Sequence, residues 1–123
     1  MSRASLAACV VIAVLSRAGG AAGAQGLDAP PGANLAVVAE ATTSFVSGHE
    51  TIAALNDGAT PAHSDDKRGG AYGNWPRRGT QWVQYEWRRP ISTARTDVYW
   101  FDDGRGVRLP KACRLLYWDG GAF

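Results

Sequence analysis

The segment 81–87 (QWVQYEW) constrains the fold of this chain more than any other, because its residues alternate in character. Val83, Tyr85 and Trp87 fall on one face of an extended chain, and the even-numbered residues fall on the other. Such alternation is typical of a β-strand with one face buried, and its aromatic and β-branched residues favour strands. We therefore predict an all-β protein.

Other short apolar runs fit the same fold class. Residues 97–101 (DVYWF) predict a strand that is buried on both faces, and residues 114–118 (RLLYW) predict a further strand. Weaker strands are expected at 35–38 and 44–46, and residues 50–55 could form one helical turn. The long connections are rich in turn-forming residues, so we expect a sandwich whose loops carry recognition.

The N-terminal segment has the features of a secretory signal. Arg3 precedes an apolar run at 6–15, which is too short to span a bilayer, and small residues follow at 22–24. We predict a signal peptide over 1–24, a mature chain that begins at Gln25, and a secreted or periplasmic location. The alternative is an N-terminal core helix, although nothing in the sequence caps it. Residues 25–33 (QGLDAPPGA) read as a linker.

Charge and cysteine content exclude several function classes. The chain has 13 basic and 11 acidic residues; Arg3 and Arg17 would leave with the signal, so the mature chain is balanced. A balanced charge argues against nucleic-acid binding. Cys9 would leave as well, and Cys113 alone can form neither an intramolecular disulfide nor a cysteine-based zinc cluster. No later stretch is long enough for a transmembrane helix, so no membrane contact is expected after cleavage.

Three motifs follow one another in a recognisable order: Asn-Leu-Ala at 34–36, Ala-Leu-Asn-Asp-Gly at 54–58 and Trp-Val-Gln-Tyr at 82–85. This order resembles the opening half of discoidin domains, also called coagulation factor 5/8 type C domains, which are galactose-binding-like jelly rolls. The resemblance implies a jelly-roll β-sandwich over residues 34–123.

A closer resemblance is to the sandwich module that is appended to bacterial β-L-arabinofuranosidase-type glycoside hydrolases. The motifs that carry it are Trp-Pro-Arg-Arg-Gly-Thr at 75–80, Val-Tyr-Trp-Phe-Asp-Asp at 98–103, Gly-Arg-Gly at 104–106, Pro110, and Arg-Leu-Leu-Tyr-Trp-Asp-Gly at 114–120. The family fold continues with several more strands beyond this Asp-Gly turn, so we expect the sandwich to be incomplete, as in a fragment of a longer gene.

The resemblance implies a non-catalytic carbohydrate-binding module of an exported glycan-degrading system, with a glycan as its partner. The alternative is a structural β-sandwich that buttresses the catalytic domain of a glycoside hydrolase and binds no sugar itself. In that case Trp75, Arg77 and Arg88 would form an interdomain contact.

Sugar recognition requires a flat aromatic face and charged groups that hydrogen-bond hydroxyls. Trp75 lies in a polar, glycine-rich segment, whereas Trp82 and Trp100 lie in expected strands and are assigned to packing. The alternative for Trp75 is a lid over the core, and for the acidic residues an Asp–Arg pair that shapes a loop. The candidate ligand-binding residues are Trp75, Arg77, Asp102, Asp103, Arg105 and Lys111.

Catalysis is not expected. Asp102 and Asp103 could suggest a glycosidase, but neighbours on a strand point to opposite faces and would not flank one scissile bond. His49 and His63 have no partner at a spacing that makes a metal site or a catalytic dyad, so both are expected to be solvated loop residues.

A structural calcium ion is the one metal that the resemblance implies, with Asp57 and Thr60 as ligands in the loop at 56–60 (NDGAT). Calcium takes about six to eight oxygen ligands, so these two side chains would need main-chain help. The alternative is an Asx-type turn that holds no ion. No cofactor is required.

Overall fold

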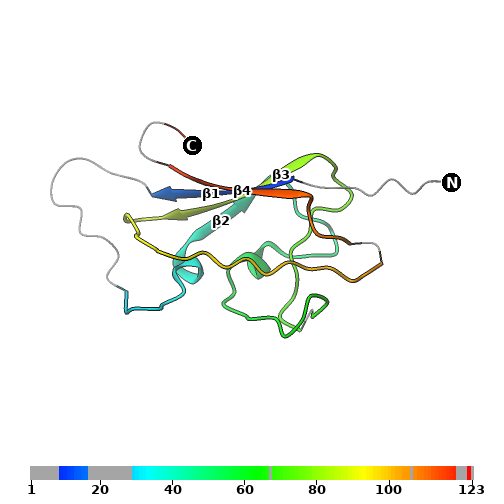
Figure 1. The fold of residues 1–123 in the computed structure, drawn as a ribbon, viewed down its shortest axis with the longest axis horizontal. Coiled ribbons are helices and arrows are strands. Elements are labelled where there is room, and N and C mark those ends of the chain that lie inside the picture. Colours follow the sequence, from blue (N-terminus) through cyan, green and yellow to red (C-terminus); the bar gives the residue numbers. More distant parts are fainter. Residues whose placement is uncertain (1–8, 17–28, 67, 106, 119–121, 123) are drawn as a thin grey trace.

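The computed structural model describes residues 9–16, 29–66, 68–105, 107–118 and 122. Its regular elements are η1 (Leu35–Val38) and η2 (Ile52–Leu55), which are 3-10 helices, and the strands β1 (Cys9–Ser16), β2 (Glu40–Thr43), β3 (Thr80–Trp87) and β4 (Ala112–Tyr117). The strands form one sheet in the order β2-β3-β1-β4, with the long connections gathered beneath it in Figure 1. The protein therefore has a small all-β fold. None of the described helices is long and apolar enough to cross a membrane.

The pairing within the sheet is mixed. β2 runs antiparallel to β3, whereas β1 runs parallel to both β3 and β4. The register sets Ile12 of β1 beside Val83 of β3 on one side and beside Leu115 of β4 on the other. Residues in the same row of a sheet share a face, so Leu115 lies on the same face as Val83.

The core lies beneath β3. Val83 is 4% exposed and Trp87 is 5% exposed, whereas Trp82, on the opposite face, is 40% exposed. The predicted alternation of 81–87 is thus confirmed, with the strand beginning one residue earlier. This face also anchors both 3-10 helices, because Trp87 Nε1 donates to the carbonyl of Leu35 at 2.8 Å and the Tyr85 hydroxyl donates to the carbonyl of Leu55 at 2.8 Å.

The prediction of a strand at 35–38 is wrong, because these residues form η1. Asn34 caps the helix by accepting the N–H of Ala36 at 3.0 Å. The amide of Asn56 then donates to the carbonyls of Ala36 and Ala39, at 3.0 and 2.9 Å. Side-chain amides therefore satisfy backbone groups that a sheet would otherwise pair. The helical turn expected at 50–55 is confirmed as η2.

The prediction of a strand at 44–46 is wrong, because β2 ends at Thr43 and residues 44–46 lie in the loop that follows it. Ser44 itself still contacts β3: its N–H donates to the carbonyl of Trp82 at 3.1 Å, and its hydroxyl accepts the Trp82 N–H at 3.2 Å. The serine side chain thus replaces the next backbone partner in the ladder, and regular pairing stops.

The strand expected at 97–101 is absent, so that prediction is wrong. Val98 and Tyr99 are exposed and Trp100 is half-buried, in a connection that passes beneath the sheet in Figure 1. Aromatic and β-branched residues favour a strand only where a neighbouring strand pairs with them. Here the backbone of Asp102 instead donates to the carbonyl of Ser64, at 2.8 Å.

β4 confirms the strand predicted at 114–118 and begins two residues earlier. Its apolar side chains are not covered as those of β3 are. Leu115 is 53% exposed and Tyr117 is 72% exposed, although both lie on the face that is buried at Val83. The connections that bury Val83 therefore leave the β4 part of this face exposed at Leu115 and Tyr117.

β1 lies inside the segment predicted as a signal peptide, which also covers residues outside those that the structure describes. Pairing within the folded chain does not bear on whether residues 1–24 are removed, so the signal peptide stays a prediction. What the structure adds is that the apolar part of this segment can serve as a strand at the centre of the sheet.

Candidate functional site

Trp75 lies in a tight turn in the loop that leads into β3. The turn is closed by the N–H of Arg77, which donates to the carbonyl of Asn74 at 2.8 Å, and the Trp75–Pro76 peptide bond is cis. The indole is 66% exposed, so it does not form a lid over the core. Its ring lies 6.0 Å from the ring of His49, at an interplanar angle of 39°.

Arg77 turns back from the same turn onto Phe45. Its guanidinium carbon lies 4.7 Å from the centroid of the Phe45 ring, a cation–π distance. We call Phe45, His49, Trp75 and Arg77 the Trp75 cluster. It combines an exposed flat ring with two side chains that can donate hydrogen bonds, which is the combination expected of a sugar-binding surface.

The two loops that carry the Trp75 cluster are bonded to each other through their backbones. Ser47 donates to the carbonyl of Gly73 at 2.8 Å, and Thr51 donates to the carbonyl of Ala71 at 3.0 Å. The loops approach so closely at Gly73 that a Cβ atom there would lie 3.1 Å from Cγ of Glu50. These contacts bring together the two loops that carry His49 and Trp75.

The Tyr72 hydroxyl ties the same loop to the sheet. It lies 2.5 Å from Thr43 Oγ1 and donates to the carbonyl of Phe45 at 3.1 Å. Thr43 Oγ1 in turn donates its only proton to the carbonyl of Trp82, at 2.7 Å. Tyr72 is therefore the donor toward Thr43, and its proton is shared between Thr43 and Phe45. Burial raises the pKa of Tyr72 above its ordinary value.

Asp102 and Asp103 organise their own loop. Asp102 Oδ1 accepts the N–H of Gly104 at 2.7 Å and lies 3.6 Å from Nη1 of Arg108. Asp103 Oδ1 accepts the N–H groups of Arg105 and Val107, at 2.8 and 3.0 Å. These bonds match the loop-shaping alternative, with Arg108 in place of Arg105 as the basic partner.

The loop that contains Ser64 contacts Asp102, whose backbone N–H donates to the carbonyl of Ser64. Asp66 accepts both guanidinium contacts of Arg68, at 2.9 and 2.6 Å, and the N–H of Ala62 at 3.0 Å. The hydrogen bond from the Arg68 guanidinium, followed by that from the Ala62 backbone, lowers the pKa of Asp66 well below its usual range. The side chains of Arg105 and Lys111 are both exposed.

Sequence-predicted ligand residues thus fall into two groups. Trp75 and Arg77 share one turn beside the 45–51 loop, whereas Asp102, Asp103 and Arg105 share a loop that is bonded to the 62–68 segment. The Trp75 group has an exposed aromatic face, and the aspartates of the second group are occupied with backbone N–H groups.

The proposed calcium ligands lie in an Asx-type turn, where Asp57 Oδ1 accepts the N–H of Ala59 at 2.8 Å. Asp57 and Thr60 are both exposed. Within the described ranges, no three His, Cys, Asp or Glu side chains lie together in a group that could hold a metal ion. These two side chains alone do not meet the oxygen demand of calcium. Calcium binding here stays a prediction.

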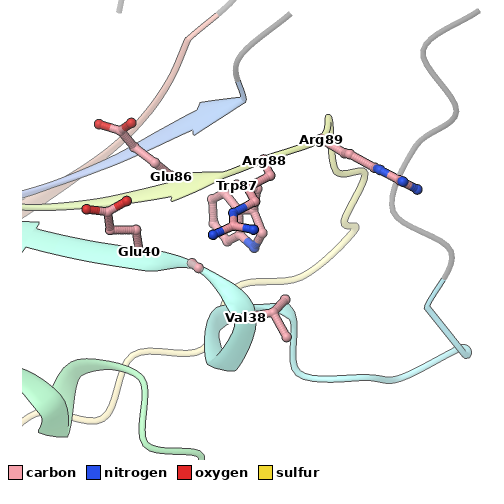
Figure 2. A pocket seen from close by; sticks show the side chains of 7 residues that line it. Val38, Glu40, Glu86, Trp87, Arg88 and Arg89 are labelled. Atoms are coloured by element: carbon pink, nitrogen blue, oxygen red, sulfur yellow. The ribbon is translucent and has the colours of Figure 1, made fainter.

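The structure also shows an open depression of about 920 Å³ that sequence reasoning missed (Figure 2). Glu40 and Glu86 face each other across the β2–β3 pairing, and Arg88 and Arg89 follow at the end of β3. The buried indole of Trp87 offers no stacking surface. Only the strand register brings the two glutamates together, and the sequence does not reveal that register.

The sequence did identify Trp75 and Arg77. It wrongly placed Phe45 in a weak strand, whereas His49 is an exposed loop residue as predicted, and the sequence did not indicate that either lies beside the Trp75 turn. Their approach depends on hydrogen bonds between two loops, which no local pattern predicts. Comparison with protein-family models, with curated proteins and with solved structures finds no match, and membership of the discoidin family therefore stays a prediction from the motif order.

Proposed function

We propose that this chain is a non-catalytic carbohydrate-binding module of an exported glycan-degrading system. The observation that carries the proposal is Trp75, an indole that is 66% exposed on a turn held between two hydrogen-bonded loops. An exposed tryptophan on a fixed loop is a stacking surface for the apolar C–H face of a sugar ring.

Neighbouring groups support the same reading. The His49 ring lies 6.0 Å from Trp75, and Arg77 is held in place by its contact with Phe45. Both can donate hydrogen bonds to hydroxyl groups at the edge of a stacked sugar. Because the Ser47–Gly73 backbone bond holds the two loops together, little conformational freedom would be lost when a sugar binds.

For the fold we propose a discoidin-like jelly roll in which the observed sheet is one layer of a sandwich. The motif order supports this, and so does the exposure of Leu115 and Tyr117 on the face that is buried at Val83. A second sheet packed on that face would cover both side chains.

Affinity electrophoresis tests the function. The full chain should be retarded in native gels that contain arabinan or galactan, and simple sugars should compete. Trp75→Ala should weaken binding about 10-fold or more, which corresponds to about 1.4 kcal/mol of lost stacking. Trp82→Ala is the matched control, since Trp82 is also exposed but lies on the opposite face of the sheet from the core and the loops that cover it. If the unmodified chain is not retarded, or if both variants weaken binding equally, the proposal is wrong.

A second candidate is a structural module that packs against the catalytic domain of a glycoside hydrolase. The uncovered side chains of β4, Leu115 and Tyr117, favour it, because exposed apolar surface on one strand is typical of a contact area. It predicts no free-sugar binding, and it predicts a reading frame for a large glycosidase domain in the adjoining DNA.

A further inference from the structure

β1 is the strand on which the sheet depends. All eight of its residues, Cys9–Ser16, pair with β3, and six of them pair with β4 on the opposite side. β4 is not a neighbour of β3 in the sheet order. Among the described strands, therefore, β4 is joined to the sheet only through β1.

Processing of the predicted signal peptide would remove this strand. Its loss would expose the N–H and C=O groups along one edge of β3, from Thr80 to Trp87, and would leave β4 without its partner. Such an edge accepts an added strand readily, because the N–H and C=O groups that point toward it have lost the strand with which they paired. On the other edge of β3, β2 pairs with residues 83–86.

We propose that this edge of β3 is a strand-binding site, which residues 9–16 occupy in the uncleaved chain and which an extended apolar peptide, supplied in trans, occupies after processing. The inference rests on the proposed export of the chain. The sequence of β1 (CVVIAVLS) defines the chemistry of the occupant: about eight uncharged residues, mostly β-branched or aliphatic, running parallel to β3. Backbone hydrogen bonds would supply the affinity in this mode of recognition.

The test uses the full chain with a specific protease site placed at residues 22–25, so that the cut does not depend on cellular processing. After cutting, a fluorescent peptide spanning residues 8–17, with C9S to prevent oxidation, is added in excess. We expect it to exchange with the cleaved N-terminal segment and to co-elute with the rest of the chain in size-exclusion chromatography. The matched control peptide carries Ile12→Pro, which removes a ladder N–H at the centre of the strand, and should bind at least about 10-fold more weakly.

The inference is overturned if neither the cleaved segment nor the peptide co-elutes with the cut chain, whether or not that chain aggregates. Equal binding of both peptides also overturns it, because it indicates non-specific apolar association. Neither of these results bears on sugar binding by Trp75, which affinity electrophoresis tests separately. N-terminal sequencing of the secreted chain that finds residues 9–16 retained also overturns the inference, because β1 then keeps this edge of β3 occupied.

Discussion

The Tyr72 hydroxyl is the clearest link between the sheet and the Trp75 cluster, and Tyr72→Phe removes only that group. The substitution breaks its contacts with Thr43 Oγ1 and with the carbonyl of Phe45, at 2.5 and 3.1 Å. The ring and its packing stay. The carbonyl of Phe45 loses its side-chain donor, while Thr43 keeps its bond to the carbonyl of Trp82.

The expected loss of stability follows from the hydrogen bonds that the substitution removes. A hydrogen bond in a half-buried site contributes about 1 kcal/mol net, and an acceptor left without its donor adds to the loss. We expect Tyr72→Phe to lower the free energy of unfolding by about 1–2 kcal/mol. Thr43→Val should cost about 1 kcal/mol, because the carbonyl of Trp82 still accepts the N–H of Ser44 at 3.1 Å.

Urea unfolding of the two single variants and the double variant measures the coupling. Because the two hydroxyls form one chain, the double variant should lose at least about 0.5 kcal/mol less than the sum of the single losses. Tyr117→Phe is the control, since its hydroxyl is on a residue that is 72% exposed, and it should change stability by less than about 0.5 kcal/mol. Additive losses, or an equal loss in the control, would refute the reasoning.

Two other predictions concern pH and backbone conformation. Burial raises the pKa of both Tyr72 and Tyr85 above the ordinary value of 10.0, so the folded chain holds these protons more tightly than the unfolded chain. Stability should therefore be constant as pH approaches 10 from below and fall as pH rises beyond it, and Tyr85→Phe should flatten that fall in unfolding curves. Gly79 has a φ of +81° and open space around it, so Gly79→Ala should lower the free energy of unfolding by about 1–2 kcal/mol through backbone strain alone. Gly48 also faces open space but has no left-handed φ, so Gly48→Ala should lower it by less than about 0.5 kcal/mol. Equal losses of stability in thermal unfolding would contradict this.

The parts of the fold that the sequence predicts are those with local signals. β3 is recognisable because Val83 and Trp87 alternate with residues of the other face, and that pattern does not depend on knowing its neighbours. Gly79 differs from β3 in this respect, because the Trp-Pro-Arg-Arg-Gly-Thr motif contains the glycine but only the structure shows that it adopts a left-handed φ of +81°.

The parts that the sequence misses depend on distant partners. Residues 35–38 and 97–101 are short apolar runs that fit a strand equally well, but Asn56 directs the first into a helical turn from about 20 positions away, and the second has no ladder partner. In the candidate site the same limit applies to His49, because only the bonding of two loops brings it beside Trp75.

The position of β1 at the centre of the sheet has a consequence for the order of events during synthesis. The ribosome makes Cys9–Ser16 first and Ala112–Tyr117 last, although the two strands pair. At a synthesis rate of roughly 5–20 residues per second, β1 waits on the order of 5–20 s for its second partner. β3, which pairs with all eight residues of β1, is made before β4, so in the last part of that interval only the β4 side of β1 lacks its partner. The sheet can therefore form in two steps that follow the order of synthesis, with the parallel β1–β3 pair first and β4 added to the other edge of β1 afterwards.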